Sequence, residues 1–262
     1  MEEILVIKIG GNIIDDENAL ADFLHSFSKI NQPKILIHGG GKLATQLSTK
    51  MNIETKMIDG RRITDAETLK IVTMVYAGYI NKNIVAKLQS NHCNAIGLSG
   101  ADAKLIQAHK RKHPSIDYVF VGDITTINTS LLIDLVEKGY APIVAPICAD
   151  AEGQLLNTNA DTIASSIAIA LAERINIKLY YCFEKKGLLA NIEDETSNIK
   201  EININDIQIM IDNQSIVAGM IPKVQNIKQA ILQGVSEVTL CHAQDLLDIV
   251  HKNSIFGTTF KN

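Results

Sequence analysis

Short, almost uninterrupted apolar segments recur along the chain, and longer stretches with helical periodicity separate them. The segments occupy residues 4–9, 34–37, 95–98, 142–146, 177–182 and 237–241. Strands that are apolar on both faces are typical of parallel sheets covered by helices on both sides. The helical stretches occupy residues 15–30, 42–51, 65–88, 130–138, 161–172 and 222–233. The alternation predicts an α/β fold, a three-layer αβα sandwich with an open, mainly parallel central sheet.

The composition excludes several classes of protein. Of the 262 residues, 46% are hydrophobic and 21% are charged, as in ordinary globular proteins. A net charge of −4 offers no basic field to nucleic acid or an anionic membrane. No signal-peptide pattern or membrane-length apolar run is found. We therefore expect a cytoplasmic protein without nucleic-acid or membrane partners, and we interpret the basic run at residues 109–113 as a solvated loop.

The four cysteines, Cys93, Cys148, Cys182 and Cys241, show none of the spacings of a zinc site. All lie in or beside apolar stretches. We expect them to be small buried side chains in a reducing compartment, and we expect no metal held by protein ligands.

Two predicted strands end in glycine clusters. Gly10 and Gly11 follow the first strand, and residues 39–41 follow the second strand and open a helix. Ligands of open α/β sheets bind at the carboxyl ends of strands, where glycine lets backbone N–H groups approach an anion. Lys8 adds a positive charge two residues before the first cluster. Together the clusters favour phosphate binding over a pair of tight turns.

The second cluster also permits a different interpretation. It is no Walker-type loop, because Leu43 follows Gly41 and Lys42 where Ser or Thr is required. Residues 39–44 do fit G-x-G-x-x-A, and Asp59 lies at a dinucleotide-binding spacing beyond them. An NAD-dependent oxidoreductase is therefore an alternative, although it leaves Lys8 unexplained.

Three predicted helix starts carry polar or charged side chains, which are either solvated or functional, and the first of them has more than capping requires. One is the segment 157–161, which holds Asn157, Asn159 and Asp161. The others are Lys223 and the pair of arginines at 61 and 62. Such groups suit phosphoryl transfer to a carboxylate, which is already ionised at pH 7 and needs no general base.

Preorganised positive charge is what this transfer requires of the protein. Two lysines 4 Å apart would repel by about 4 kcal/mol at an effective dielectric constant of about 20. A carboxylate between them relieves most of that repulsion. We expect Asp161 to lie between Lys8 and Lys223.

The motifs in their order resemble the N-acetylglutamate kinases of the amino-acid kinase family. They occupy residues 8–11, 38–41, 60–64, 97–102, 157–161 and 219–223, and the resemblance extends to residues 257–259. It implies one amino-acid kinase domain over residues 1–262. The N-terminal lobe, residues 1–175, would bind the acyl-amino acid, and the C-terminal lobe, residues 176–262, would bind ATP. The implied reaction is phosphorylation of the γ-carboxylate of N-acetyl-L-glutamate by ATP with Mg²⁺, in arginine biosynthesis.

The resemblance also implies roles for individual residues. Lys8 and Lys223 would stabilise the transition state, and Asp161 would orient them. Backbone N–H groups for the phosphates and the substrate carboxylate would come from Gly10, Gly11, Gly40 and Gly41. Arg62 and Asn157 would hold the α-carboxylate and acylamide end of the substrate. The nucleotide site would be lined by Glu184, Lys185, Lys186, Gly187, Leu188, Ser215, Ile216 and Val217.

The sequence departs from the family pattern at two places. The nucleotide-side strand usually ends in Thr/Ser-Asp-Val-x-Gly, whereas residues 181–187 here read Tyr-Cys-Phe-Glu-Lys-Lys-Gly. Arg61 stands where the family commonly has an apolar residue. An arginine there would suit an acyl group that ends in a carboxylate, such as N-succinyl, through a charge-assisted pair, unless it points to solvent. N-succinyl-L-glutamate or another N-acyl dicarboxylic amino acid is therefore an alternative substrate.

Further alternatives concern activity and assembly. A non-catalytic sensor would be expected to lack one of Lys8, Asp161 and Lys223, and all three are present. An N-acyl aminoadipate differs from the glutamate analogue by one methylene, which is worth about 1–3 kcal/mol of discrimination. The chain also begins within a few residues of its first strand, without the N-terminal helix that links dimers of arginine-inhibited relatives into rings. We expect a plain homodimer without arginine feedback.

Overall fold

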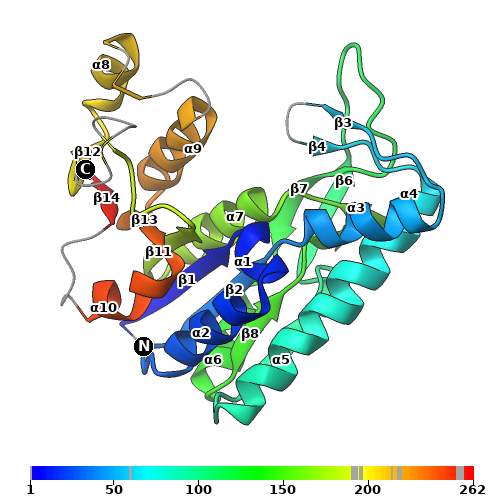
Figure 1. Ribbon diagram of the computed structural model, residues 1–262, viewed down its shortest axis with the longest axis horizontal. Helices are drawn as coiled ribbons and strands as arrows, with labels where there is room; N and C mark the ends of the chain where they lie inside the picture. Colours follow the sequence, from blue (N-terminus) through cyan, green and yellow to red (C-terminus); the bar gives the residue numbers. More distant parts are fainter. Residues whose placement is uncertain are drawn as a thin grey trace. The chain divides into compact units, whose positions relative to one another are not determined.

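The computed structural model describes residues 2–58, 61–189, 194, 197–213, 215–216, 220–251 and 257–262. Spatial contacts divide the chain into two compact units (Figure 1). Residues 1–34 and 164–262 form what we call the first unit, and residues 35–163 form the second unit. Each unit contains parallel strands and helices, as the alternating sequence pattern predicts. The division into lobes at residues 175 and 176 stays a prediction.

The sheet of the first unit is mainly parallel. In spatial order its strands are β12 (Glu201–Asn203), β14 (Thr258–Lys261), β13 (Glu237–His242), β11 (Asn176–Phe183) and β1 (Glu3–Ile9). β11 pairs in parallel with β1 and β13, and β14 pairs in parallel with β12 and antiparallel with β13. In β1 the apolar side chains are buried, and Lys8 is a half-buried exception near the carboxyl end. This explains why the strand reads as apolar except at one position.

Helices of the first unit follow its strands. They are α1 (Gly11–Asp15), α2 (Glu17–Ser28), α8 (Ile207–Asp212), α9 (Ile221–Leu232), the 3-10 helix η4 (Ala243–Asp245) and α10 (Leu246–Val250). The sequence predicts one helix over residues 15–30, and this is wrong at its start. Asp16 has an extended backbone and accepts hydrogen bonds from the N–H groups of Asn18 and Ala19, so it begins a new helix.

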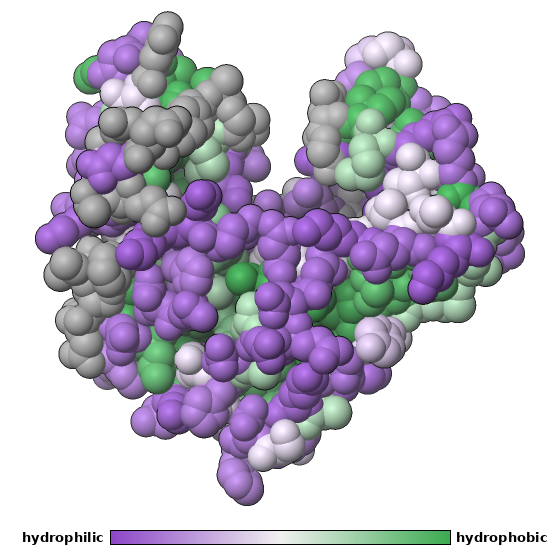
Figure 2. Space-filling view, viewed as in Figure 1, coloured by the Kyte–Doolittle hydropathy of each residue, from purple (hydrophilic) through white to green (hydrophobic). Residues whose placement is uncertain are grey.

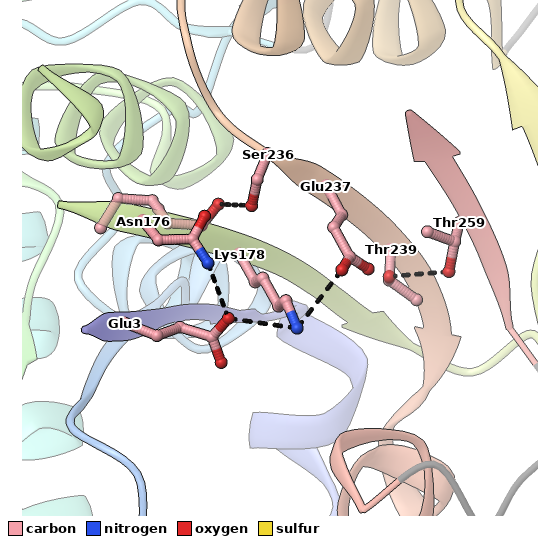
Figure 3. Close-up of polar contacts among 8 residues, drawn as sticks. Glu3, Asn176, Lys178, Ser236, Glu237, Thr239 and Thr259 are labelled. Atoms are coloured by element: carbon pink, nitrogen blue, oxygen red, sulfur yellow. Dashed lines mark hydrogen bonds and ion pairs between the residues drawn. The ribbon is translucent and has the colours of Figure 1, made fainter. Parts of the chain in front are cut away.

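A polar cluster joins the amino ends of three strands in this unit (Figure 3). The Lys178 ammonium on β11 lies 3.1 Å from the carboxylate of Glu3 on β1 and 3.3 Å from that of Glu237 on β13. Burial lowers the pKa of Lys178, but the hydrogen bonds and charges of the two glutamates outweigh it, and the net pKa is raised. The cluster therefore ties neighbouring strands together at the end opposite Lys8.

The second unit contains a short parallel sheet, ordered β2 (Lys34–His38), β8 (Ala141–Val144) and β5 (Ala95–Leu98). β8 pairs in parallel with both neighbours. Its helices are α3 (Gly41–Lys50), α4 (Ala66–Val72), the π-helix η1 (Thr73–Ile80), α5 (Asn81–Ser90), the 3-10 helix η2 (Asp102–Lys104) and α6 (Thr129–Glu137). α7 (Ala160–Ala172) begins in the second unit and continues into the first.

A second, four-stranded sheet in this unit has no counterpart in the predicted pattern. Its order is β10 (Leu155–Asn157), β9 (Ile147–Ala149), β6 (Ile106–Lys110) and β7 (Gly122–Ile127). A hairpin of β3 (Met57–Ile58) and β4 (Arg61–Arg62) accompanies it. In Figure 1 this hairpin and the loop between β6 and β7 lie at the same end of the unit, and Thr64 bridges to Val119 there. This end holds both arginines of the predicted substrate site.

Within the described ranges, no helix is long and apolar enough to cross a bilayer. The four cysteines are free thiols and buried, which confirms their predicted structural role. Leu189 and Asn198, the two end residues of the polar stretch at 189–198, form an antiparallel bridge.

Candidate active site

Arg62 places a buried guanidinium in the second unit. Only 6% of its surface is exposed. Nη2 donates to the Gly41 carbonyl at 2.9 Å and to Thr45 Oγ1 at 2.8 Å, and Nη1 donates to Thr55 Oγ1 at 3.1 Å. Burial raises the pKa of Tyr76, and the charge and hydrogen bond of Arg62 partly offset this. Among the residues described, no carboxylate is paired with Arg62, so its charge is available to an anionic ligand.

Asn157 reaches the same region through Thr64. Its Nδ2 donates to Thr64 Oγ1 at 3.0 Å, and this hydroxyl donates to the Arg62 carbonyl at 3.0 Å. The backbone of both residues is bound to one segment, because Thr64 N donates to the Tyr118 carbonyl and Asn157 N to the Phe120 carbonyl. The structure thus brings Arg62 and Asn157 together, linked by the hydroxyl of Thr64, for which no such role was predicted.

The second glycine cluster opens α3 beside Arg62. Gly40 has φ of +145°, a conformation that favours glycine, and a Cβ there would clash with the Ile80 side chain. Its carbonyl accepts from Ala44 N, the first hydrogen bond of the helix. A Cβ on Gly41 would meet only the Arg62 guanidinium, at 4.0 Å. The N–H groups that follow have no partner within the helix and suit an anion.

Asn159 caps α7, and Asp161 does not. The side chain of Asn159 accepts from Asp161 N at 2.7 Å and from Thr162 N at 3.3 Å. Because Asn159 is the cap, the half-buried Asp161 carboxylate in the first turn is not needed to cap the helix. Its expected place between Lys8 and Lys223 stays a prediction.

The two lysines of the first unit approach the carboxyl end of β11. Lys8 lies opposite Tyr181 in the pairing of β1 with β11. Lys223, in the first turn of α9, has its Nζ 5.8 Å from the centroid of the Tyr181 ring and 5.1 Å from that of Phe183. Ring faces attract ammonium groups at such distances. Both lysines are therefore placed at one end of the sheet.

The first glycine cluster lies at the same end. Gly10 N donates to the Cys182 carbonyl at 3.1 Å, so this N–H is engaged with β11. α1 begins at Gly11, and Asn12 donates its side-chain amide to Glu184. Glu184 is thereby held beside the cluster, at the place where the family pattern has an aspartate.

The predicted nucleotide segment divides into an exposed and a buried part. Glu184, Lys185 and Lys186 are exposed, whereas Gly187 and Leu188 are buried. Gly187 has φ of +149°, and Leu188 N donates to Thr258 Oγ1 at 2.8 Å. Ser215 is half-buried and Ile216 buried, and Val217 lies outside the described residues.

Arg61 belongs to a different group from Arg62, because neighbouring residues of a strand point to opposite sides. Burial and the charge of Arg111 lower the pKa of Arg61, while Asp123 and Tyr118 act in the opposite sense. Arg111 lies 3.6 Å from the Asp123 carboxylate and 5.4 Å from the Tyr118 ring centroid. Within this group, two guanidinium groups face one carboxylate. The interpretation of residues 109–113 as a solvated loop is wrong at two places. His109 and Lys110 are exposed but belong to strand β6, and the Arg111 side chain is only 22% exposed because it packs into this group.

Three partners of the site received no role in the sequence analysis, although Thr64 and Thr258 lie within the motifs of the resemblance. Thr64 follows Arg62 by two positions and so shares its side of the chain, which is a weak signal. Tyr76 reaches Arg62 from η1, and Thr258 reaches Leu188 from the distant β14. Tyr76 has no local sequence signal, whereas Thr258 belongs to the motif at residues 257–259.

The amino acid kinase family model matches residues 3–242. The acetylglutamate kinase of Cytophaga hutchinsonii is 51% identical over 98% of this chain and 98% of its own. Among solved structures, smu.665 from Streptococcus mutans has a TM-score of 0.77 at 27% identity, covering 98% of each chain. Carbamate kinase from Giardia lamblia bound to AMP-PNP has a TM-score of 0.73 at 13% identity, covering 100% of this chain and 99% of its own. These matches confirm the predicted fold class and remove the NAD-dependent oxidoreductase alternative. The chain belongs to the amino acid kinase family.

Proposed function

We propose that the protein transfers the γ-phosphoryl group of ATP to the γ-carboxylate of N-acetyl-L-glutamate, a step of arginine biosynthesis. The observation that carries the proposal is the buried Arg62 guanidinium, whose described contacts include no carboxylate. An α-carboxylate fits it through a charge-assisted pair, and the adjacent Asn157 offers an amide to the acylamide end. The acetylglutamate kinases that match the chain over nearly its full length support the same substrate.

The residues then divide the work as follows. Lys8 and Lys223 neutralise charge on the transferring phosphoryl group, and Asp161 orients the two ammonium groups and offsets their mutual repulsion. Arg62 and Asn157 position the substrate in the lobe of residues 1–175, and residues 184–188 and 215–217 bind ATP in the lobe of residues 176–262. The γ-carboxylate is ionised at neutral pH, so no side chain has to remove a proton.

Mg²⁺ completes the proposal. Among described residues, no group of three or more His, Cys, Asp or Glu side chains is placed to hold a metal ion. Mg²⁺ is commonly bound through substrate phosphates and water, so we infer that it arrives with ATP. When bound, it neutralises phosphate charge that the two lysines would otherwise meet alone.

The test is trapping of the acyl phosphate with hydroxylamine. ATP, Mg²⁺ and N-acetyl-L-glutamate should yield a hydroxamate, and free glutamate and aspartate should yield little. N-acetyl-aminoadipate serves as the chain-length control. No hydroxamate from any N-acyl dicarboxylic amino acid would overturn the proposal.

The cluster of Arg61, Arg111 and Asp123 favours a second kind of acyl group on the substrate. Its two guanidinium groups outnumber its one carboxylate, and Arg111 Nη1 is buried without a hydrogen-bond acceptor among the described residues. Thr64 connects Asn157 to the segment that carries Tyr118, beside Arg111. A carboxylate at the end of an N-succinyl group fits this excess of charge, so we propose N-succinyl-L-glutamate as a further substrate.

Replacing Arg61 by alanine should lower kcat/KM for N-succinyl-glutamate about 10- to 100-fold, as expected for loss of a hydrogen-bonded charge pair. The value for N-acetyl-glutamate should stay within about threefold. Lys112→Ala, which removes an exposed charge from the same loop, is the control. If the ratio of the two substrates is the same in Arg61→Ala as in the unchanged protein, the N-succinyl proposal is wrong.

We further propose a homodimer in the cytoplasm. α3 and η1 line a groove of about 350 Å³, and Met74 and Tyr79 on its rim are 52% and 62% exposed. Figure 2 shows hydrophobic surface over this part of the second unit. Because groove and protruding side chains are adjacent, a second copy related by a twofold axis can insert its rim into the groove. The buried free thiols fit a reducing compartment.

Light scattering should give a mass of about twice 28.7 kDa. Tyr79→Glu should shift it toward one subunit, because the charge would be buried in the interface. Tyr140→Glu, at another exposed tyrosine, should leave the mass unchanged. A single-subunit mass for the unchanged protein, a mass well above two subunits, or an intact dimer in Tyr79→Glu would contradict this interface.

A further inference from the structure

The π-helix η1 directs side chains toward the predicted substrate residues of the second unit. Tyr76 lies within the electrostatic influence of the Arg62 guanidinium, and Ile80 lies against Gly40 so closely that no Cβ fits there. Asn81, the first residue after η1, is also buried. π-helical turns are rare and occur frequently at functional sites. The helical stretch from α4 to α5 therefore also contacts the predicted substrate residues, in addition to packing on the sheet.

Asn81 joins two strands through one amide. Its Nδ2 donates to the Ile143 carbonyl at 2.9 Å and lies 3.1 Å from His38 Nε2. The Ile143 carbonyl can only accept, which fixes the orientation of the amide. Lys82 Nζ, 3.2 Å from Asn81 Oδ1, donates to the other end of the group. Asn81 consequently offers a donor, and only a donor, to His38.

The His38 ring in turn fixes the first peptide of the glycine cluster. Its Nδ1 lies 2.9 Å from the Gly39 carbonyl, which needs a donor, while Nε2 faces the Asn81 donor. The ring must therefore carry its proton on Nδ1. In a planar trans peptide the N–H points away from the carbonyl. Holding the Gly39 carbonyl toward His38 thus turns the Gly40 N–H away from the ring.

The charge state of His38 agrees with this arrangement. Burial lowers its pKa to about 4, the hydrogen bond to Gly39 opposes this, and the charge of Lys82 lowers it further. With this lowered pKa, the His38 ring of the folded protein stays neutral at every pH above about 4. A histidine in the unfolded chain is protonated below about pH 6.5, so the two states differ in protonation between about pH 4 and 6.5. The pair with Asn81 accordingly persists unchanged across neutral pH.

We propose that Asn81 is a positioning residue: through the neutral His38 ring it fixes the Gly39–Gly40 peptide and so aims the N–H groups at the start of α3. The proposal rests on the phosphoryl transfer proposed above and on the role that the family resemblance implies for the N–H groups of Gly40 and Gly41. Asn81 touches neither substrate nor nucleotide in this account. It acts on the reaction by setting the direction of N–H groups that meet developing charge.

The test replaces Asn81 by aspartate, which has the same shape but offers no donor. The carboxylate can pair with His38 only when Nε2 is protonated, so the pKa of His38 should rise toward neutrality. We expect kcat to be about tenfold below that of the unchanged protein at pH 8, the value of about one hydrogen bond, and within about threefold of it at pH 6. KM for both substrates should change less than about threefold. A loss of packing alone would not produce this pH dependence.

Asn83→Asp makes the same change two residues further along α5, at a half-buried position, and should retain the original pH profile. Nitrogen NMR of the histidine rings gives a second readout. In the unchanged protein His38 should be protonated at Nδ1, bare at Nε2 and without titration from pH 5.5 to 8. Titration of His38 in that range, or an Asn81→Asp profile equal to the original, would overturn the proposal. If Asn81→Asp does not fold, the NMR result decides alone. Hydroxamate formation by the unchanged protein separates this outcome from failure of the proposed function.

Discussion

Replacing Lys8 by methionine is expected to lower kcat for phosphorylation of N-acetyl-glutamate about 100- to 1,000-fold, the usual cost of losing one preorganised group that stabilises the transition state. The half-buried position of Lys8 near the end of β1 accommodates the methionine side chain, so the sheet should persist. KM for ATP and for the acyl-amino acid should stay within about threefold, because the ammonium acts when charge develops. Initial rates with both substrates varied give the separate constants.

Lys29→Met, at the exposed C-cap of α2 in the same unit, is the matched control and should retain full activity. Lys8→Arg keeps the charge but not the compact ammonium geometry, and it should recover only part of the rate. A Lys8→Met protein that retains more than about a tenth of kcat would show that Lys8 does not meet the phosphoryl group.

Replacing Arg62 by methionine is expected to raise KM for the acyl-amino acid, whereas Lys8→Met lowers kcat. We expect KM for N-acetyl-glutamate to rise about 30- to 150-fold, which corresponds to about 2–3 kcal/mol for a buried charge-assisted pair. KM for ATP should change little. KM for N-acetyl-glutamate in Arg62→Lys should lie between the values of the unchanged protein and Arg62→Met, because lysine keeps the charge but loses the paired geometry.

Arg62 also holds the Gly41 carbonyl and the Thr45 hydroxyl, so thermal unfolding has to be measured alongside. Thr55→Val removes a different contact of the same guanidinium and should change KM less than about fivefold. An unchanged KM for the acyl-amino acid in Arg62→Met would exclude Arg62 from the substrate site.

The sequence predicted those parts of the fold in which local pattern and burial agree. The strands β1, β2, β11 and β13, which are buried on both faces, read as apolar runs, and their boundaries agree within a residue or two with the predicted ones. The half-buried β5 is also apolar and agrees as well. The strands β6 and β7 carry no such pattern, and β9 and β10 are only three residues long. In β7 most positions are only partly buried or exposed, and the residues are mainly polar or β-branched. Their pairing is decided by partners far along the chain.

The same distinction holds at the site. Arg62, Asn157 and Lys223 are chemically conspicuous and stand beside predicted helix starts, so sequence reasoning finds them. Tyr76 and Asn81 are hidden inside a long apolar helical stretch, where they read as ordinary helix positions. Their contacts depend on the wider turn of η1, and residue propensities do not predict a π-helix.

The division of the chain into a continuous and an interrupted unit has a consequence for biosynthesis on the ribosome. Residues 35–163 form the second unit without a break, so that unit has all of its chain available once its last helix has emerged. β1 cannot pair with β11 at that stage, because Glu3 pairs with Asn176, more than 170 residues later in the chain. Until β11 has been translated, the nascent chain displays an apolar strand that lacks this neighbour, and closing so long a loop is slow. We therefore expect Lys8 to be among the last residues to reach its final position, long after Arg62 has reached its own.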